Sequence, residues 1–226
     1  MSIKSNIATI NQSLPPACRL IAVSKTQPIE KIQEAYDAGQ RIFGENKAQE
    51  MEEKYQRLPM DIEWHMIGHL QTNKVKYIAP FVALIHSVDS VKLLAEINKQ
   101  GKKINRIIPC LLQLHIAKED TKFGLSEQEA LDLLQNFPPT FTHVQIVGLM
   151  GMATFTDNPQ IVKDEFIGLK QFFDKLQQIP STEYLSIKEL SMGMSADFTI
   201  GVEVGSSLVR IGTAIFGDRN YENADA

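Results

Sequence analysis

The sequence predicts an α/β fold in which a parallel sheet closes into a single (β/α)8 TIM barrel. Short apolar runs alternate with amphipathic helical patterns along almost the whole chain, as is typical of parallel strands joined by helices. Eight such units follow one another, which is the number that closes a barrel. The length of 226 residues, with 43% hydrophobic residues, suits one such domain. A doubly wound open sheet is the alternative that this pattern leaves open.

The expected strands are runs rich in apolar and β-branched residues, each bounded by polar or helical segments. The fifth of them is a nearly continuous apolar run. In chain order the strands are expected at residues 19–24, 41–44, 62–67, 82–87, 106–114, 144–150, 184–190 and 207–211.

The helices expected in the first half of the chain follow the first three strands. Pro28 suits the first turn of a helix and Gly39 its end, and apolar residues recur between them at helical spacing. A second amphipathic helix is expected at 48–55. A short polar helix at 72–77 completes the third unit.

The helices of the second half have clearer signals. One is expected over 91–101, and the pair Ser126 and Glu129 has the spacing of a capping box that opens the next. The clearest apolar stripe lies over 162–176, where the spacings are 4, 3, 4 and 3. A last helix over 198–204 leads into the eighth strand.

We expect residues 1–226 to form one domain, because about a dozen residues after the last strand leave no room for a second one. Residues 1–13 are expected to form an extra N-terminal helix that covers the floor of the barrel.

Composition and charge exclude several classes of protein. The net charge of −4 and the pI of about 5.8 offer no basic face for nucleic acid. No apolar run approaches the length of a membrane span, and residues 1–16 lack the apolar centre of a signal peptide. Cys18 and Cys110 have no metal-binding spacing and lie in or beside apolar runs, so we expect buried, inert thiols. These features favour a cytoplasmic protein.

In a parallel barrel the active groups lie at the C-terminal ends of the strands. Lys25 directly follows the first strand. On position alone, a solvated loop lysine is the more common case. The alternative is an amine held over the barrel mouth, where its pKa can be lowered and where it can condense with an aldehyde.

Other candidates follow strands seven and eight, where barrels commonly bind phosphate. Gly212 and Thr213 follow the eighth strand and Ser195 the seventh, although an ordinary turn would also explain a Gly-Thr pair. Arg210 ends the eighth strand, either as a salt-bridge partner or as a donor to a ligand ring. Asn46, after strand two, fits a helix N-cap and a contact to the ligand equally well.

The positions of the histidines along the chain argue against a metal site. His65 and His69 are four residues apart, but His65 falls in a strand and His69 lies beyond Gly68. They therefore need not share a helix face, and no third ligand is evident nearby, so zinc is a minor alternative.

Six ordered motifs between Leu20 and Gly217 match one family. The matching stretches are 20–28 (LIAVSKTQP), 39–46 (GQRIFGEN), 63–74 (EWHMIGHLQTNK), 147–152 (VGLMGM), 190–197 (LSMGMSAD) and 205–217 (GSSLVRIGTAIFG). On these motifs the chain resembles the pyridoxal-phosphate homeostasis proteins over nearly its full length. It departs from their pattern at Lys47, His115 and Ser207, where an aromatic residue, asparagine and threonine are expected.

The resemblance implies a fold-type III barrel that binds pyridoxal 5′-phosphate, similar to the barrel of alanine racemase without its C-terminal β domain. It also assigns roles to residues. These are Lys25 as the Schiff-base lysine, Arg210 toward the pyridine nitrogen, Asn46 near the ring, and Ser195, Gly212 and Thr213 at the phosphate.

The implied function is to bind, buffer and deliver the cofactor, with effects on vitamin B6 and amino-acid balance and without established turnover. Its partners would be pyridoxal phosphate and the apoenzymes that depend on it, and we expect a monomer. Arg210 supports a carrier, because a permanent cation keeps the pyridine nitrogen unprotonated and weakens the ring as an electron sink. Two alternatives stay open, a small amino-acid racemase or decarboxylase of the same fold type and an aldolase-like Schiff-base barrel.

Overall fold

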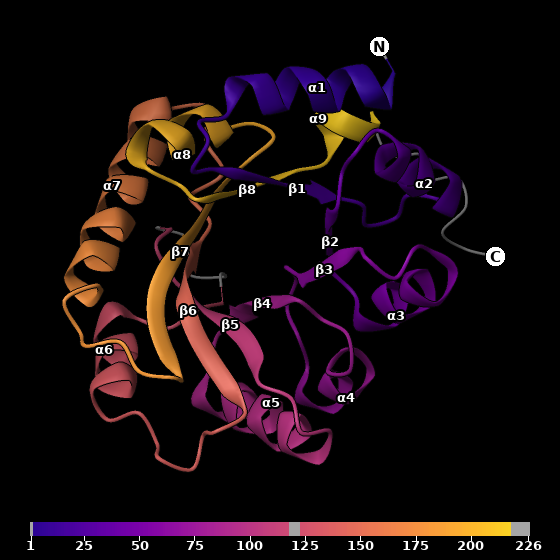
Figure 1. The fold of residues 1–226 in the computed structure, drawn as a ribbon. Helices are drawn as coiled ribbons and strands as arrows, with labels where there is room; N and C mark the ends of the chain where they lie inside the picture. The colour runs from indigo at the N-terminus through magenta and orange to yellow at the C-terminus, as the bar shows by residue number, and fades with distance from the viewer. Residues whose placement is uncertain (1, 118–122, 218–226) are drawn as a thin grey trace.

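The computed structural model describes residues 2–117 and 123–217. Its strands pair in parallel in the order β1 to β8, and β8 pairs with β1, so the sheet is a closed barrel (Figure 1). Helices surround the barrel on its outside (Figure 1). The predicted barrel is confirmed, and the open doubly wound alternative is excluded.

All eight predicted strands are present, and most of their ends agree within two residues. The largest difference is at the end of the seventh strand, which continues to Met194 and so reaches the mouth of the barrel. The strands are β1 (Arg19–Val23), β2 (Ile42–Glu45), β3 (Glu63–Met66), β4 (Leu84–Val88), β5 (Ile108–Leu114), β6 (Val144–Gly151), β7 (Leu185–Met194) and β8 (Leu208–Ile211).

The helices also follow the predicted order. The capping box is confirmed, because the Ser126 side chain accepts from the Glu129 N–H and the Glu129 side chain accepts from the Ser126 N–H. The helices are α1 (Ile3–Ser13), α2 (Ile29–Asp37), α3 (Ala48–Arg57), the 3₁₀ turn η1 (Thr72–Lys74), α4 (Val75–Ile78), α5 (Val91–Lys103), α6 (Glu127–Gln135), α7 (Pro159–Leu176), α8 (Phe198–Val204) and α9 (Thr213–Phe216).

The N-terminal helix α1 does not cover the barrel floor, and that expectation is wrong. It packs on β1, α2 and α9 in the outer layer of helices (Figure 1). The Asn6 side-chain amide donates to the Ile215 carbonyl at 2.9 Å. Helix α1 buries a stripe of isoleucines. Charged side chains such as Arg19, Glu63 and Glu189 line the floor, so the stripe finds an apolar partner only at the side of the barrel.

Strand alternation divides the interior into two cores. The larger one lies between the strands and the helices. The smaller one fills the inside of the barrel, where Ile21, Leu111 and Met150 pack together. In β1 the alternation places Ile21 and Val23 inside, so the next inward position is Lys25, just beyond the strand end.

The two cysteines are buried free thiols, as the sequence predicted. Burial raises the pKa of Cys18 to about 11 and that of Cys110 further above its ordinary value, so both stay protonated at neutral pH. In the described ranges, none of the helices combines the length and apolar character that crossing a membrane requires.

Candidate functional site

A cavity of about 780 Å³ opens at the C-terminal ends of the strands. This volume lies in the range usual for small-molecule sites. The loops after β1, β2, β6, β7 and β8 contribute most of its wall. All six residues predicted for the site line this one cavity, and these are Lys25, Asn46, Ser195, Arg210, Gly212 and Thr213.

Lys25 lies in the turn that follows β1 and is half-buried at the cavity wall. The turn is closed by the Gln27 N–H, which donates to the Ser24 carbonyl at 3.0 Å. Thr26 has a φ of 62°, a left-handed conformation that costs a residue with a side chain roughly 1–2 kcal/mol. Lys25 therefore lies at the mouth of the barrel, next to a position of strained backbone.

Arg210 is buried inside the barrel and is 4% exposed. Its Nη1 donates to the Ser191 carbonyl at 2.9 Å and to the Ser191 hydroxyl, and its Nη2 donates to the Gly151 carbonyl at 3.1 Å. Burial lowers the pKa of Arg210 to about 10, and the Asp197 carboxylate opposes that shift. The guanidinium thus stays charged at neutral pH while these hydrogen bonds go to neutral oxygens.

The loops after β7 and β8 meet at Gly212, whose N–H donates to the Ser195 hydroxyl at 3.2 Å. A Cβ atom on Gly212 would lie 3.1 Å from the Val23 carbonyl oxygen, a close contact that favours glycine at this point. Thr213 is exposed and follows directly at the cavity wall. Two hydroxyl-bearing residues and a glycine backbone are therefore brought together, a donor set suited to an anionic group.

Asn46 lines the part of the wall that follows β2. The N-cap alternative is wrong, because Lys47 occupies the N-cap position of α3 and its side chain makes no capping hydrogen bond. A Cβ on Gly68 would lie 2.6 Å from the Asn46 carbonyl oxygen, so glycine permits the chain after β3 to approach Asn46.

Sequence reasoning missed the wall contributed by residues 153–157, after β6. This loop is tied to α7, since the Thr154 N–H and hydroxyl both donate to the Glu165 carboxylate at 2.7 Å. The rule that loops after strand ends form the site would have included it, but the segment carries no distinctive motif.

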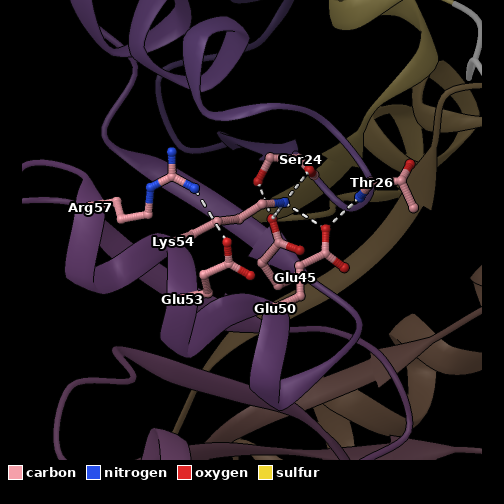
Figure 2. A network of polar contacts seen from close by, with 7 residues as sticks. All are labelled: Ser24, Thr26, Glu45, Glu50, Glu53, Lys54 and Arg57. Atoms are coloured by element: carbon pink, nitrogen blue, oxygen red, sulfur yellow. Dashed lines mark hydrogen bonds and ion pairs between the residues drawn. The ribbon is translucent and has the colours of Figure 1, made fainter. Parts of the chain in front are cut away.

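A charged cluster buried on the outer side of the strands was also missed (Figure 2). Lys54 donates to the Ser24 carbonyl at 2.8 Å, to Glu45 Oε1 at 2.8 Å and to Glu50 Oε1 at 2.7 Å. Burial raises the pKa of Glu45 to about 7, against the effect of the Lys54 charge. The sequence did indicate that Lys54 is buried, because Lys54 lies three residues after Met51 on the apolar face of α3.

A second buried chain of polar groups runs through the barrel from Arg210. The Ser191 hydroxyl lies 2.9 Å from His86 Nδ1, and His86 Nε2 lies 3.0 Å from His65 Nδ1. Burial lowers the pKa of His65 to about 3 and that of His86 well below its ordinary value, so both are neutral. His69 instead pairs with Asp89 at 3.1 Å, so the geometry does not support a metal site shared by His65 and His69.

Comparison with known proteins places the chain in a family. Residues 1–220 match the family model described as alanine racemase, N-terminal domain. The chain is 42% identical over 205 residues to the pyridoxal phosphate homeostasis protein of Aquifex aeolicus, covering 90% of this chain and 88% of the relative. It is 38% identical over 216 residues to the human protein of the same name, covering 90% of this chain and 77% of the relative.

Solved structures agree with these matches. PipY of Synechococcus elongatus, solved with pyridoxal phosphate bound, superimposes with a TM-score of 0.84 at 36% identity, over 96% of this chain and 100% of that chain. Alanine racemase of Bartonella henselae has a TM-score of 0.70 at 20% identity, over 99% of this chain and 60% of that chain, and this likeness shows the fold alone. The chain therefore belongs to the pyridoxal phosphate homeostasis protein family, on the barrel of the alanine racemase N-terminal domain.

Proposed function

We propose that the chain binds pyridoxal 5′-phosphate, holds it as a Schiff base on Lys25, and buffers and delivers it. One observation carries this proposal. Residues from the ends of four strands, an amine, a guanidinium, an amide and a set of small hydroxyl and glycine donors, line a single cavity. Close relatives carry the name of pyridoxal phosphate homeostasis proteins, and the PipY structure contains this cofactor.

The residues fit the chemical groups of the cofactor. Bound pyridoxal phosphate supplies an aldehyde, a phosphate and a pyridine ring that can accept electrons. An aldehyde forms a Schiff base with a primary amine, and Lys25 would supply that amine. Ser195, Gly212 and Thr213 offer hydroxyl and backbone donors for the phosphate, and the close approach of Gly212 to Val23 keeps that part of the wall free of a side chain.

Arg210 would face the ring nitrogen, and Asn46 would lie near the ring. A guanidinium only donates hydrogen bonds, so its partner nitrogen must remain an acceptor. The pKa of about 10 keeps Arg210 charged through the physiological range. A ring held in this way is a weak electron sink, which favours storage over turnover and supports a carrier without enzymatic activity.

Several further features belong to the same proposal. We propose that residues 1–226 form one domain, that the protein is a cytoplasmic monomer, and that its partners are apoenzymes that depend on pyridoxal phosphate. The closed barrel contains every described strand, which supports the single domain.

The proposal is tested by trapping the linkage. After incubation with pyridoxal phosphate, borohydride reduction and peptide mass mapping should find the added mass on the peptide that contains Lys25. Lys25→Ala should abolish this label and leave the fold intact, because the residue lies at the rim. Lys47→Ala is the matched control, an exposed lysine beside Asn46 that should leave the label in place.

Two outcomes would contradict the proposal. Labelling of another lysine in the wild-type protein would show that the site assignment is wrong. Sustained interconversion of D- and L-amino acids, followed by chiral chromatography at enzyme-like rates, would favour a racemase over a carrier.

A further inference from the structure

The residues on both sides of Lys25 are tied to one buried cluster (Figure 2). On one side, the Ser24 hydroxyl donates to Glu45 Oε1 at 2.6 Å, and the Ser24 carbonyl accepts from Lys54 at 2.8 Å. On the other side, the Thr26 N–H donates to Glu50 Oε1 at 2.6 Å. The cluster therefore fixes the backbone immediately before and immediately after the lysine.

Strand register explains how this cluster can control a side chain on the opposite face. Val23 pairs with Gly44, so the next residues, Ser24 and Glu45, lie side by side at the strand ends. These two face the helices, and the alternation turns the following residues, Lys25 and Asn46, toward the cavity. A hydrogen bond on the outer side thereby sets the positions of two side chains on the inner side.

The turn needs this support because its geometry is unfavourable. Thr26 and Asn105 are the non-glycine residues with positive φ in the described part of the chain, and Thr26 has a φ of 62°. Such strain persists only when surrounding contacts hold it. A hydrogen bond from the Thr26 N–H to a carboxylate is of the strong, charge-assisted kind.

Lys54 connects the two sides. Its ammonium has three donors, and the three bonds to Ser24, Glu45 and Glu50 use all of them. The side chain is 6% exposed and that of Glu45 is fully buried, so this cation compensates carboxylate charge away from water.

We propose that Lys54, with Glu45 and Glu50, positions Lys25 by fixing the turn over 24–26 so that its amine enters the cavity. The function of the aimed amine rests on the proposed binding of pyridoxal phosphate. The geometry of the turn is independent of that proposal, and it can be measured in cofactor-free protein.

The first test is amide hydrogen exchange, read by mass spectrometry, on cofactor-free protein. Glu50→Ala should speed exchange in the peptide over 24–27 by about tenfold, the effect of losing one hydrogen bond to a charged acceptor. The Glu50 side chain is 22% exposed, so this variant should fold. Lys54→Met should give an equal or larger effect, and Lys99→Met, which removes an exposed pair with Glu96, should give none.

The second test is capture of pyridoxal phosphate, measured as the fraction of Lys25 trapped by borohydride across a concentration series. Half-maximal trapping should require roughly tenfold more pyridoxal phosphate for Glu50→Ala and Lys54→Met, because a misaimed amine loses the advantage of orientation. Lys54→Arg, which keeps the charge, should recover part of the loss. Lys99→Met should match the wild type.

The outcomes separate the two ideas. If the wild type is not trapped on Lys25, the proposed function fails, and the exchange data still decide whether the cluster fixes the turn. If the wild type is trapped and Glu50→Ala changes neither exchange nor trapping, the positioning role is wrong. In Glu50→Ala, faster exchange spread evenly over β2 and α3, rather than confined to 24–27, would also overturn the positioning role by showing general loosening.

Discussion

The protein uses two buried polar clusters, one on each side of the same sheet, and they differ in how they handle charge. The outer cluster behind Lys25 joins Lys54 to Glu45 and Glu50 and places charged groups in contact. The inner chain below Arg210 consists of neutral groups, a serine and the pair His65 and His86. Each cluster holds a basic residue at the cavity wall, Lys25 or Arg210, but the two do so by opposite electrostatic means.

This difference makes their responses to pH opposite. The pKa of Glu45 in the folded protein, about 7, lies above the ordinary value of 4.5. Its contribution to stability is fully present below about pH 4.5 and is lost as the pH rises toward 7. The pKa of His65, about 3, lies below its ordinary 6.5, so its contribution is present above pH 6.5 and is lost as the pH falls toward 3.

Each cluster suits its place in the molecule. The inner chain stays uncharged over the whole physiological range, so it holds Arg210 without changing the field at the cavity. The outer cluster contains a buried carboxyl oxygen, Glu45 Oε2, without a hydrogen-bond partner among the described residues. That cluster depends on one cation, and it is the part of the site most sensitive to substitution and to pH.

Breaking the charged cluster should destabilise the protein more than any other change proposed below. Lys54→Met should lower the free energy of unfolding by about 3–5 kcal/mol at pH 7.5, because it leaves a buried carboxylate without its counter-charge. Urea denaturation measures this change. The exposed control Lys99→Met should stay within about 0.5 kcal/mol of the wild type.

A double variant sharpens this result. Glu45→Gln combined with Lys54→Met removes the stranded charge and should recover part of the lost stability. If Lys54→Met alone costs less than about 1 kcal/mol, the cluster behaves like a surface pair, and the contrast between the two clusters disappears.

The next effect is a pH dependence of opposite sign in two variants, again read by urea denaturation. Relative to the wild type, Glu45→Gln should gain up to about 3 kcal/mol between pH 4.5 and 7, because a slope of about 1.4 kcal/mol per pH unit is removed. His65→Asn should gain by a similar amount, relative to the wild type, as the pH falls from 6.5 to 4.5.

Differences from the wild type are the useful quantity, since the background titration of other carboxyl groups cancels. Parallel curves for the wild type and both variants would mean that neither group changes its pKa on folding. They would remove the electrostatic contrast while leaving the hydrogen-bond geometry untouched.

Sequence patterns predicted the barrel and the six cavity residues, since both follow from local periodicity and from the rule that sites lie at strand ends. They did not predict the partners of buried polar groups. Glu45 and Lys54 are nine residues apart, and helical spacing places Lys54 on the buried face of α3 without indicating its partner, while His86 and Ser191 are 105 residues apart and meet only when the barrel closes. The predicted position of α1 on the barrel floor was wrong for the same reason, because the packing partners of α1 come together only in the closed fold.

The smallest effect tests the neutral chain through its serine. Ser191→Ala should cost about 1–3 kcal/mol in urea denaturation, because it leaves His86 Nδ1 and one Arg210 donor without their shared hydroxyl. Arg210 keeps its bonds to two backbone carbonyls, so the protein should still fold. Ser87→Ala is the matched control, a buried serine whose hydroxyl has no partner among the described residues. Truncation of Ser87 should be neutral or stabilising. Equal losses of stability in both variants would mean that the filled volume, rather than the hydrogen bonds, accounts for the contribution of Ser191.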